Sequence, residues 1–232
     1  MSIIMVNEDP STTPVHEVSL DTLVDRSRAL AHRGGRQILG ITGSPGAGKS
    51  TLAERIVAEL GPELAVLVPM DGFHFADEVL HTLDRHARKG AHDTFDAWGY
   101  VALMRRIHDQ PGAASNERDG TIYAPQFRRD LEEPIGSAIE VRADVPLVVT
   151  EGNYLLYAAQ PWPHARAVVD EAWFLEPTEE QRLTQLIARH ERFGRSPAEA
   201  KERSLGSDQR NAELINGTAA AADLRIRLLD QL

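Results

Sequence analysis

Short apolar runs recur along the chain, separated by longer segments in which apolar residues follow helical spacing. Near-continuous apolar runs are typical of strands in a parallel sheet, because helices bury both faces of such a sheet. We assign strands to residues 38–42, 64–68, 146–150 and 172–175 and to the alternating segment 222–228. Strands that alternate with helices predict an α/β fold with a central parallel sheet.

The helical spacing predicts helices between these strands and before the first of them. They cover residues 20–31, 51–60, 76–83, 97–107, 179–193 and 197–215. Two shorter pieces, to which we assign no type, lie at residues 121–127 and 138–141. Gly34-Gly35 ends the first helix, and residues 194–197 join the last two. The elements between the second and third strands form a long insertion, which we expect to flank a substrate site.

One segment combines apolar and polar residues in a pattern with a chemical meaning. Residues 43–51 read Gly-Ser-Pro-Gly-Ala-Gly-Lys-Ser-Thr, which is a complete phosphate-binding loop between a predicted strand and a predicted helix. Glycines let successive amides point at a phosphate, Lys49 adds a charge for the β- and γ-phosphates, and the Ser50 hydroxyl suits Mg²⁺. A glycine-rich turn with an incidental lysine is the alternative. The nucleotide contacts that we expect are Gly43, Ser44, Gly46, Ala47, Gly48, Lys49, Ser50 and Thr51.

This loop predicts the three-layer architecture of a P-loop NTPase. We expect the insertion between the second and third strands to bind an acceptor and the helix over residues 179–193 to form a lid. The length of 232 residues suits one well-buried domain, and no low-complexity stretch divides the chain. We expect a flexible tail over residues 1–15 and a single P-loop domain over residues 16–232.

Composition restricts the partners of the protein. The formal net charge of −10 disfavours nucleic acid, whose phosphates most of the surface would repel. The chain has no cysteine, which excludes disulfides and thiolate chemistry. No segment has membrane-spanning length, and residues 1–15 do not resemble a signal peptide. We expect a cytoplasmic protein that uses ATP and Mg²⁺ on a small-molecule substrate; the oligomeric state stays open, a homodimer included.

Two acidic residues follow predicted strands, where ligands bind in open α/β sheets. Asp71 follows the second strand, which we expect to end near the phosphate loop, and it is the candidate base for an incoming hydroxyl. Its alternative interpretation is an ordinary Asp-Gly turn. Glu151 follows the third strand and is the candidate carboxylate for Mg²⁺, with a helix-capping or turn acid as its alternative.

Basic and imidazole side chains offer further candidates. Arginine binds phosphate oxygens in a bidentate manner, so a helical lid over residues 179–193 could place arginines on the γ-phosphate. The alternative is a solvated helix face. The arginines in question are Arg182, Arg189, Arg192 and Arg195. His74, His81, His86 and His92 fit no zinc signature, so we assign no protein-bound metal site to them.

Several motifs together resemble the phosphoribulokinase/uridine kinase family over most of residues 36–216. The resemblance is strongest to the bacterial branch related to type I pantothenate kinase and to sugar kinases of fructose uptake systems. Its motifs, besides the phosphate loop, are Met70-Asp71-Gly72-Phe73-His74, Arg88-Lys89-Gly90, Asp93-Thr94-Phe95-Asp96, Tyr123-Ala124-Pro125-Gln126-Phe127, Glu151-Gly152-Asn153-Tyr154-Leu155-Leu156 and Gly206-Ser207-Asp208-Gln209-Arg210-Asn211-Ala212.

The resemblance implies a role for each candidate. Asp71 is then the catalytic base, assisted by Lys49 and by Arg189 of the lid. Ser50 and Glu151 serve Mg²⁺, and Thr51 serves the nucleotide. The acceptor side is expected to contain Arg88, Asp96, Tyr123 and Glu151.

Departures from the family motifs bear on the acceptor. Gly72-Phe73-His74 replaces the Ser-Phe-Tyr type of uridine kinases, and Ala124-Pro125-Gln126-Phe127 lacks the histidine of pantothenate kinases. We therefore predict an ATP-dependent kinase for a hydroxyl of a small polar metabolite such as a sugar, with a nucleoside or pantothenate kinase as the alternative. From another class, an ATP-dependent switch or assembly factor remains open. A GTPase is disfavoured because no Asn-Lys-x-Asp or Thr-Lys-x-Asp signature occurs.

Overall fold

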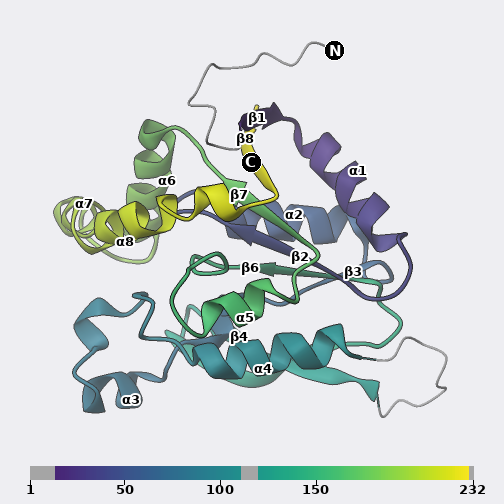
Figure 1. The fold of residues 1–232 in the computed structure, drawn as a ribbon. Coiled ribbons are helices and arrows are strands. Elements are labelled where there is room, and N and C mark those ends of the chain that lie inside the picture. Colours follow the sequence, from purple (N-terminus) through teal and green to yellow (C-terminus); the bar gives the residue numbers. More distant parts are fainter. Residues whose placement is uncertain (1–13, 111–119, 230–232) are drawn as a thin grey trace.

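The computed structural model describes residues 14–110 and 120–229 and has a parallel sheet at its centre (Figure 1). The six strands follow the order β1-β8-β7-β2-β6-β3. Their bounds are Val15–Val18 (β1), Gln37–Thr42 (β2), Ala65–Leu67 (β3), Leu147–Glu151 (β6), Glu171–Leu175 (β7) and Leu224–Leu228 (β8). All four apolar runs and the alternating segment became strands, which confirms the α/β parallel-sheet prediction. The strand β1 was not predicted, and residues 1–13 of the expected tail lie outside the described residues.

The strand order decides how Asp71 approaches the phosphate loop. Strand β6 pairs with both β2 and β3, so it separates the strand before the phosphate loop from the strand before Asp71. The register pairs Ile41 with Glu151, which puts Glu151 directly beside the end of β2. Asp71 is one strand further away, and it needs the turn after β3 to reach the loop.

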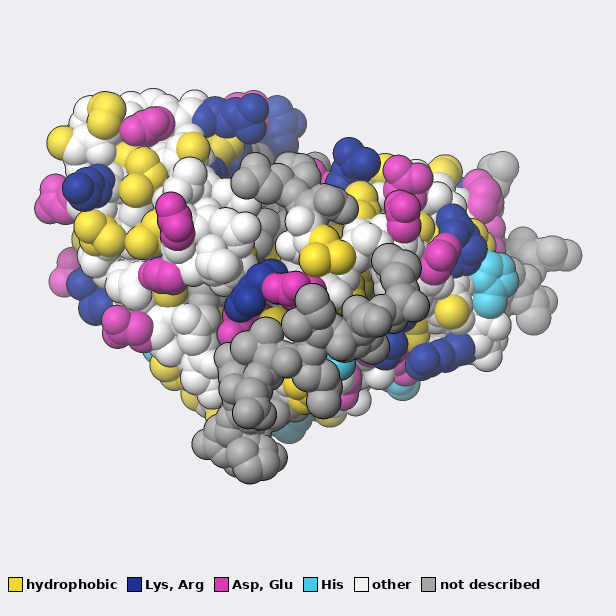
Figure 2. Space-filling model, turned by 90° about the horizontal axis from the view of Figure 1, so that it is seen from above, with side chains coloured by type: hydrophobic (Ala, Val, Ile, Leu, Met, Phe, Trp, Pro, Cys, Tyr) yellow, Lys and Arg dark blue, Asp and Glu magenta, His cyan; other side chains and the backbone are white. Residues whose placement is uncertain are grey.

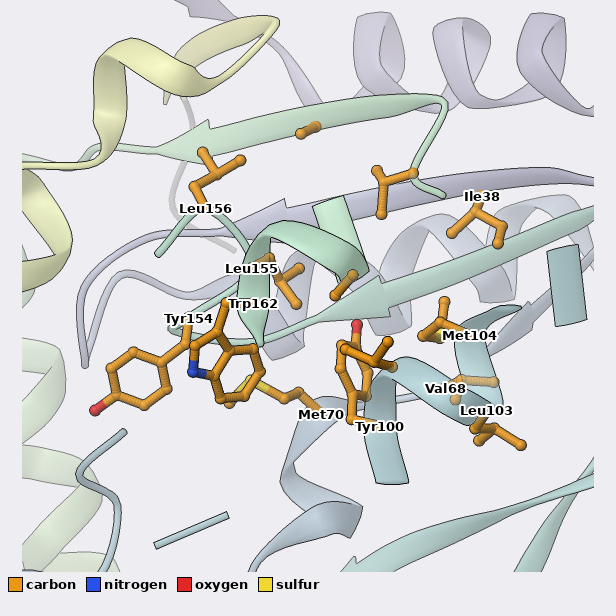
Figure 3. Packing of buried hydrophobic residues seen from close by; sticks show 14 of the residues in the cluster. Ile38, Val68, Met70, Tyr100, Leu103, Met104, Tyr154, Leu155, Leu156 and Trp162 are labelled. Atoms are coloured by element: carbon orange, nitrogen blue, oxygen red, sulfur yellow. The ribbon is translucent and has the colours of Figure 1, made fainter. Parts of the chain in front are cut away.

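Alternating side chains divide the core into two layers. Leu39, Leu147 and other inward residues of one sheet face pack against α1 (Leu20–Ala31) and α2 (Lys49–Leu60). Ile38, Val148 and Phe174 of the opposite face pack against α4 (Ala97–His108) and α5 (Trp162–Arg166). Figure 3 shows this second layer, in which Trp162 lies beside Tyr154, with ring centroids 5.6 Å apart. The three-layer prediction is therefore confirmed.

The insertion between β3 and β6 contributes most of one side of the molecule. It contains the 3-10 helix η1 (Met70–Phe73), α3 (Asp77–Thr82), the 3-10 helix η2 (His86–Arg88), α4 and an antiparallel pair of strands. The pair consists of β4 (Ile122–Arg128) and β5 (Glu133–Val141), and we call it the hairpin. The two shorter pieces that the sequence indicated are thus the paired strands of this hairpin.

Three helices follow β7 and lie beyond the carboxyl ends of the sheet strands (Figure 1). They are α6 (Glu179–Arg192), α7 (Pro197–Leu205) and α8 (Ser207–Asn216). The prediction of one helix over residues 197–215 is wrong, because the backbone leaves helical geometry at Gly206, with φ −97° and ψ −100°. A Cβ atom there would lie 2.8 Å from the Glu202 carbonyl oxygen, so glycine permits the bend.

The surface is mixed in charge on the face seen in Figure 2, where acidic and basic side chains of the described residues are interspersed. Within residues 14–110 and 120–229, no helix is both long and apolar enough to span a membrane.

Candidate active site

The phosphate loop joins the end of β2 to the start of α2. Its glycines Gly43, Gly46 and Gly48 have φ values of 145°, 83° and 92°, which disfavour any residue with a Cβ atom. A Cβ at Gly43 would overlap the Leu175 carbonyl oxygen, and one at Gly46 would lie 2.7 Å from the Arg182 carbonyl oxygen. The backbone thus forms the strand, loop and helix that the motif requires, and glycine lets the loop pack closely against β7 and α6.

Neighbouring helices hold this loop from outside. Arg182 is buried, and its Nη1 donates to the Pro45 carbonyl oxygen at 3.0 Å. The same guanidinium pairs with Glu179 of α6 and Gln209 of α8. From the end of α8, Asn216 accepts a hydrogen bond from the Ser44 hydroxyl. The Gly206–Ala212 motif therefore supports the loop through Gln209, which sequence reasoning missed because these contacts join distant segments.

Lys49 and Glu151 are buried charged residues at the loop, and the partly buried Ser50 lies beside them. Lys49 Nζ donates to the Ser44 carbonyl oxygen at 3.1 Å, and Ser50 Oγ donates to Glu151 Oε1 at 3.1 Å. Burial, with help from Asp71, raises the pKa of Glu151 to about 7, while nearby Lys49 opposes the shift. Burial lowers the pKa of Lys49 to about 8. In both groups burial disfavours the charged form, and ionisable groups in such surroundings are typical of functional sites.

The oxygen atoms of Ser50 and Glu151 are ligands of the kind that Mg²⁺ prefers. The described residues contain no group of three or more His, Cys, Asp or Glu side chains that could hold a metal without help. Mg²⁺ usually takes one or two protein oxygens and completes its shell with phosphates and water. The donor set at the loop therefore fits a Mg²⁺ that arrives with a nucleotide.

Two close contacts at glycines position η1, which carries Asp71, next to this group. A Cβ at Gly152 would lie 2.6 Å from the Met70 Cβ, and one at Gly72 would overlap the Pro125 carbonyl oxygen of the hairpin. Glycine at both positions lets η1 lie tightly between β6 and the hairpin. The Asp71 charge consequently influences the pKa values of Lys49 and Glu151, so this acid belongs to the same electrostatic group.

Two cavities meet at the loop. The first, of about 730 Å³, is lined by the loop, α6 and the end of β8, and we call it the P-loop cavity. The second, of about 480 Å³, extends over the insertion and the start of α8, and we call it the insertion cavity. Charged side chains of both signs line the insertion cavity: Lys49, Asp71, Asp77, Lys89, Arg129, Glu132, Glu151, Arg189, Arg195, Arg203 and Asp208.

The predicted lid arginines separate into different environments. Arg189 lines both cavities, Arg192 lines the P-loop cavity and Arg195 lines the insertion cavity. Arg182 supports the loop instead of facing either space. The lid interpretation thus fits three of the four arginines in position, with Arg189 at the centre.

Three residues expected on the acceptor side lie elsewhere. Arg88 is exposed and pairs with Asp93, Asp96 caps α4 by accepting from the Gly99 amide at 2.9 Å, and Tyr123 is 55% exposed on β4. The structure places none of Arg88, Asp96 and Tyr123 on the wall of either cavity.

Lys89, Arg129 and Arg203 line the insertion cavity, and sequence reasoning did not select them. Lys89 belongs to the Arg88-Lys89-Gly90 motif, so that motif carried a usable signal. Arg129 and Arg203 carried none in spacing or composition.

Comparison with known proteins agrees with this geometry. The model of the phosphoribulokinase/uridine kinase family matches residues 38–231, and that of the methylmalonyl Co-A mutase-associated GTPase MeaB matches only residues 3–68. A protein of Schizosaccharomyces pombe named "Putative uridine kinase C227.14" is 30% identical over 224 residues, which are 91% of each chain. The crystal structure of a "putative fructose transport system kinase from Silicibacter sp. TM1040" has a TM-score of 0.77 and 31% identity, covering 90% of this chain and 98% of that one.

A more distant structure shares the fold. YFH7 from Saccharomyces cerevisiae has a TM-score of 0.76 at 18% identity, covering 92% of this chain and all of its own. The family match spans the loop, the insertion and the three helices beyond the sheet, whereas the GTPase match ends before Asp71. The chain belongs to the phosphoribulokinase/uridine kinase family and is one of its ATP-dependent P-loop kinases.

Proposed function

We propose that this kinase transfers the γ-phosphoryl group of ATP to a hydroxyl of a small polar metabolite, with Asp71 as the base. The observation that carries the proposal is the position of Asp71, which lines the insertion cavity together with Lys49, Ser50 and Glu151. A hydroxyl bound in that cavity would meet the γ-phosphate beside a carboxylate.

The chemistry requires positioning more than covalent help. Phosphoryl transfer passes through a loose transition state, so the protein holds the acceptor in line, accepts its proton and stabilises charge on the phosphoryl oxygens. Asp71 would orient the hydroxyl and take its proton. Lys49 and Arg189 would stabilise the transferred group, while Ser50 and Glu151 would hold Mg²⁺.

The shape and lining of the insertion cavity support a small acceptor with several polar groups. Its volume of about 480 Å³ is in the range of metabolite sites. Carboxylates, ammonium and guanidinium groups line it, which suits a molecule that both donates and accepts hydrogen bonds. The name of the Silicibacter protein supports a sugar, and the name of the S. pombe protein supports a nucleoside as the alternative.

A coupled assay of ADP release tests the proposal. Sugars, polyols, nucleosides and pantothenate are offered singly with Mg²⁺ and ATP, and one class should stimulate ADP formation. Asp71→Asn should then lower kcat about 10³-fold with little change in ATP affinity, because the base acts only on the acceptor. Asp130→Asn is the matched control, since Asp130 is exposed and pairs with Arg128.

Two results would overturn the proposal. The first is tight ATP binding with no acceptor-dependent ADP release from any compound of the panel. The second is full turnover by Asp71→Asn on an acceptor that the wild type uses, because a base cannot be removed without loss of rate.

A further inference from the structure

Five residues line both cavities and therefore mark the place where they join. Lys49 and Ser50 come from the phosphate loop, and Arg189 and Phe193 come from the lid helix and its C-terminal cap. Arg129 is the fifth. Of these five residues it alone belongs to the insertion. It comes directly after β4, in the turn of the hairpin.

The docking of the hairpin delivers Arg129 to this place. Gly72 lets the Pro125 carbonyl approach η1, and four residues further along the hairpin Arg129 donates to Asp71 of η1. Two aromatic rings border the guanidinium: its Cζ lies 5.9 Å from the Phe127 ring centroid and 5.7 Å from that of Phe193. Arg129 thus contacts the hairpin and the lid at once, and cation–π attraction favours its charge there.

The Arg129 guanidinium makes few hydrogen bonds within the described part of the chain. Its single hydrogen bond within the described residues goes from Nη2 to Asp71 Oδ2 and is 3.4 Å long. Arginine has five N–H donors, so most of them remain for a ligand. A half-exposed ion pair of this length is weak and can be exchanged for a stronger one.

We propose that Arg129 is a second catalytic arginine, which binds the transferred phosphoryl group opposite the loop. The inference rests on the proposed function. In the resting enzyme Arg129 neighbours the base Asp71. With a nucleotide in place, its free donors turn to the phosphoryl oxygens, whose negative charge grows as transfer proceeds. Arg189 would bind the same group from the lid.

This role differs from two simpler ones. If Arg129 served only to pack between Phe127 and Phe193, an uncharged side chain of similar length would replace it. If it served only to hold Asp71, its loss would not change the affinity for a phosphoryl mimic bound to the loop. The test therefore measures binding of such a mimic and needs no acceptor.

Calorimetry compares two probes, Mg²⁺ with ADP and Mg²⁺ with ADP and aluminium fluoride, where the fluoride complex occupies the position of the transferred group. Arg129→Met should weaken binding of the fluoride complex about 100-fold relative to wild type and leave ADP binding within about twofold, because only the transferred group contacts Arg129. Arg129→Lys should recover part of the loss. Arg128→Met is the matched control, since Arg128 is exposed and pairs with Asp130.

The outcomes separate this inference from the proposed function. Equal affinity of wild type and Arg129→Met for the fluoride complex overturns the inference and leaves the kinase proposal standing. A fluoride complex that binds the wild type no better than ADP does also overturns it. A wild type that binds no magnesium nucleotide refutes the proposed function, and the inference falls with it. Unchanged ADP affinity in the variant shows that it is folded.

Discussion

The two cavities are built in opposite ways. The side of the P-loop cavity that we expect to face phosphate comes from one continuous segment, residues 46–51, whose backbone amides would bind it. The wall of the insertion cavity combines side chains from η1, the hairpin, the end of β6 and the helices beyond the sheet. A backbone cradle is insensitive to most side-chain changes, whereas an assembled wall depends on how its parts dock.

The difference explains where specificity can reside. Every ATP-dependent relative must bind the same triphosphate, and one rigid loop suffices for that. Acceptors differ, and side chains carried on separately docked elements can change without disturbing the sheet. Substitutions that impair one cavity and leave the other intact test this view.

The largest effect is expected from the one loop side chain that carries positive charge. Lys49→Met should lower kcat/KM about 10³-fold by removing charge stabilisation at the β- and γ-phosphates. The unfolding midpoint without nucleotide should stay close to that of the wild type, because burial already lowers the pKa of Lys49 to about 8 and disfavours its charge. Steady-state kinetics and thermal denaturation check both statements, with exposed Lys201→Met as control. Retained turnover would contradict the role of the loop.

Substitution of a glycine outside the phosphate loop should impair the insertion cavity and leave the P-loop cavity intact. Gly72→Ala would push the hairpin away from η1, because its Cβ overlaps the Pro125 carbonyl oxygen. We expect kcat/KM for the acceptor to fall about 100-fold, the order found for misplaced catalytic groups, with ATP affinity unchanged. Gly136→Ala is the control, since a Cβ there meets no atom within 4 Å. An equal loss of ATP affinity in Gly72→Ala would show that the two cavities are not independent.

The buried carboxyl of Glu151 should make stability depend on pH in a defined window. Its pKa is raised from 4.5 to about 7 in the folded protein, chiefly by burial. Between these values the folded state keeps a proton that the unfolded chain has lost, so the free energy of unfolding falls as pH rises. The slope is at most about 1.4 kcal/mol per pH unit, and the effect ends near the folded pKa.

Urea unfolding of the nucleotide-free protein from about pH 5 to pH 7 measures this slope, and Glu151→Gln should flatten it because Gln does not titrate. The Lys49 contribution lies at higher pH, above its lowered pKa of about 8, and so does not mask the window. A variant with the same slope as the wild type would remove Glu151 as the source.

The smallest effect should come from the outer support of the loop. Asn216→Ala removes the acceptor of the Ser44 hydroxyl hydrogen bond, which is worth about 1 kcal/mol or less for an exposed partner. ATP affinity should fall by no more than about fivefold, measured by calorimetry. Glu213→Ala, exposed on the same helix, should show no change. A loss comparable to that of Lys49→Met would mean that the cradle depends on α8 more than on its own backbone.

What the sequence could predict follows the same division. The loop, its flanking strand and helix, and Glu151 at the end of β6 were all accessible because each depends on neighbouring residues. The helix predicted over residues 197–215 was interrupted at Gly206, since apolar spacing continues across the break while the backbone does not. Spacing also gave no sign of β1, a four-residue edge strand.

The residues that line the insertion cavity were harder to predict from the sequence, for a physical reason. Arg129 reaches the junction through a hairpin register and the approach of Pro125 to Gly72, and neither leaves a periodic signal. Conversely, Arg88, Asp96 and Tyr123 were selected from motifs, and the structure shows them pairing, capping and exposed. Side chains near one another in a motif need not face one cavity.

The meeting of the two cavities also has a consequence for chemical probes. Lys49, Arg129 and Arg189 line both cavities and surround the place where they join, which we call the neck. A single molecule with a nucleoside at one end and an acceptor analogue at the other would have its linker in this neck. Three cations around that neck favour a short polyanionic linker over a neutral one. Inhibitors of this bisubstrate kind would take their selectivity from the hairpin and much of their affinity from the linker.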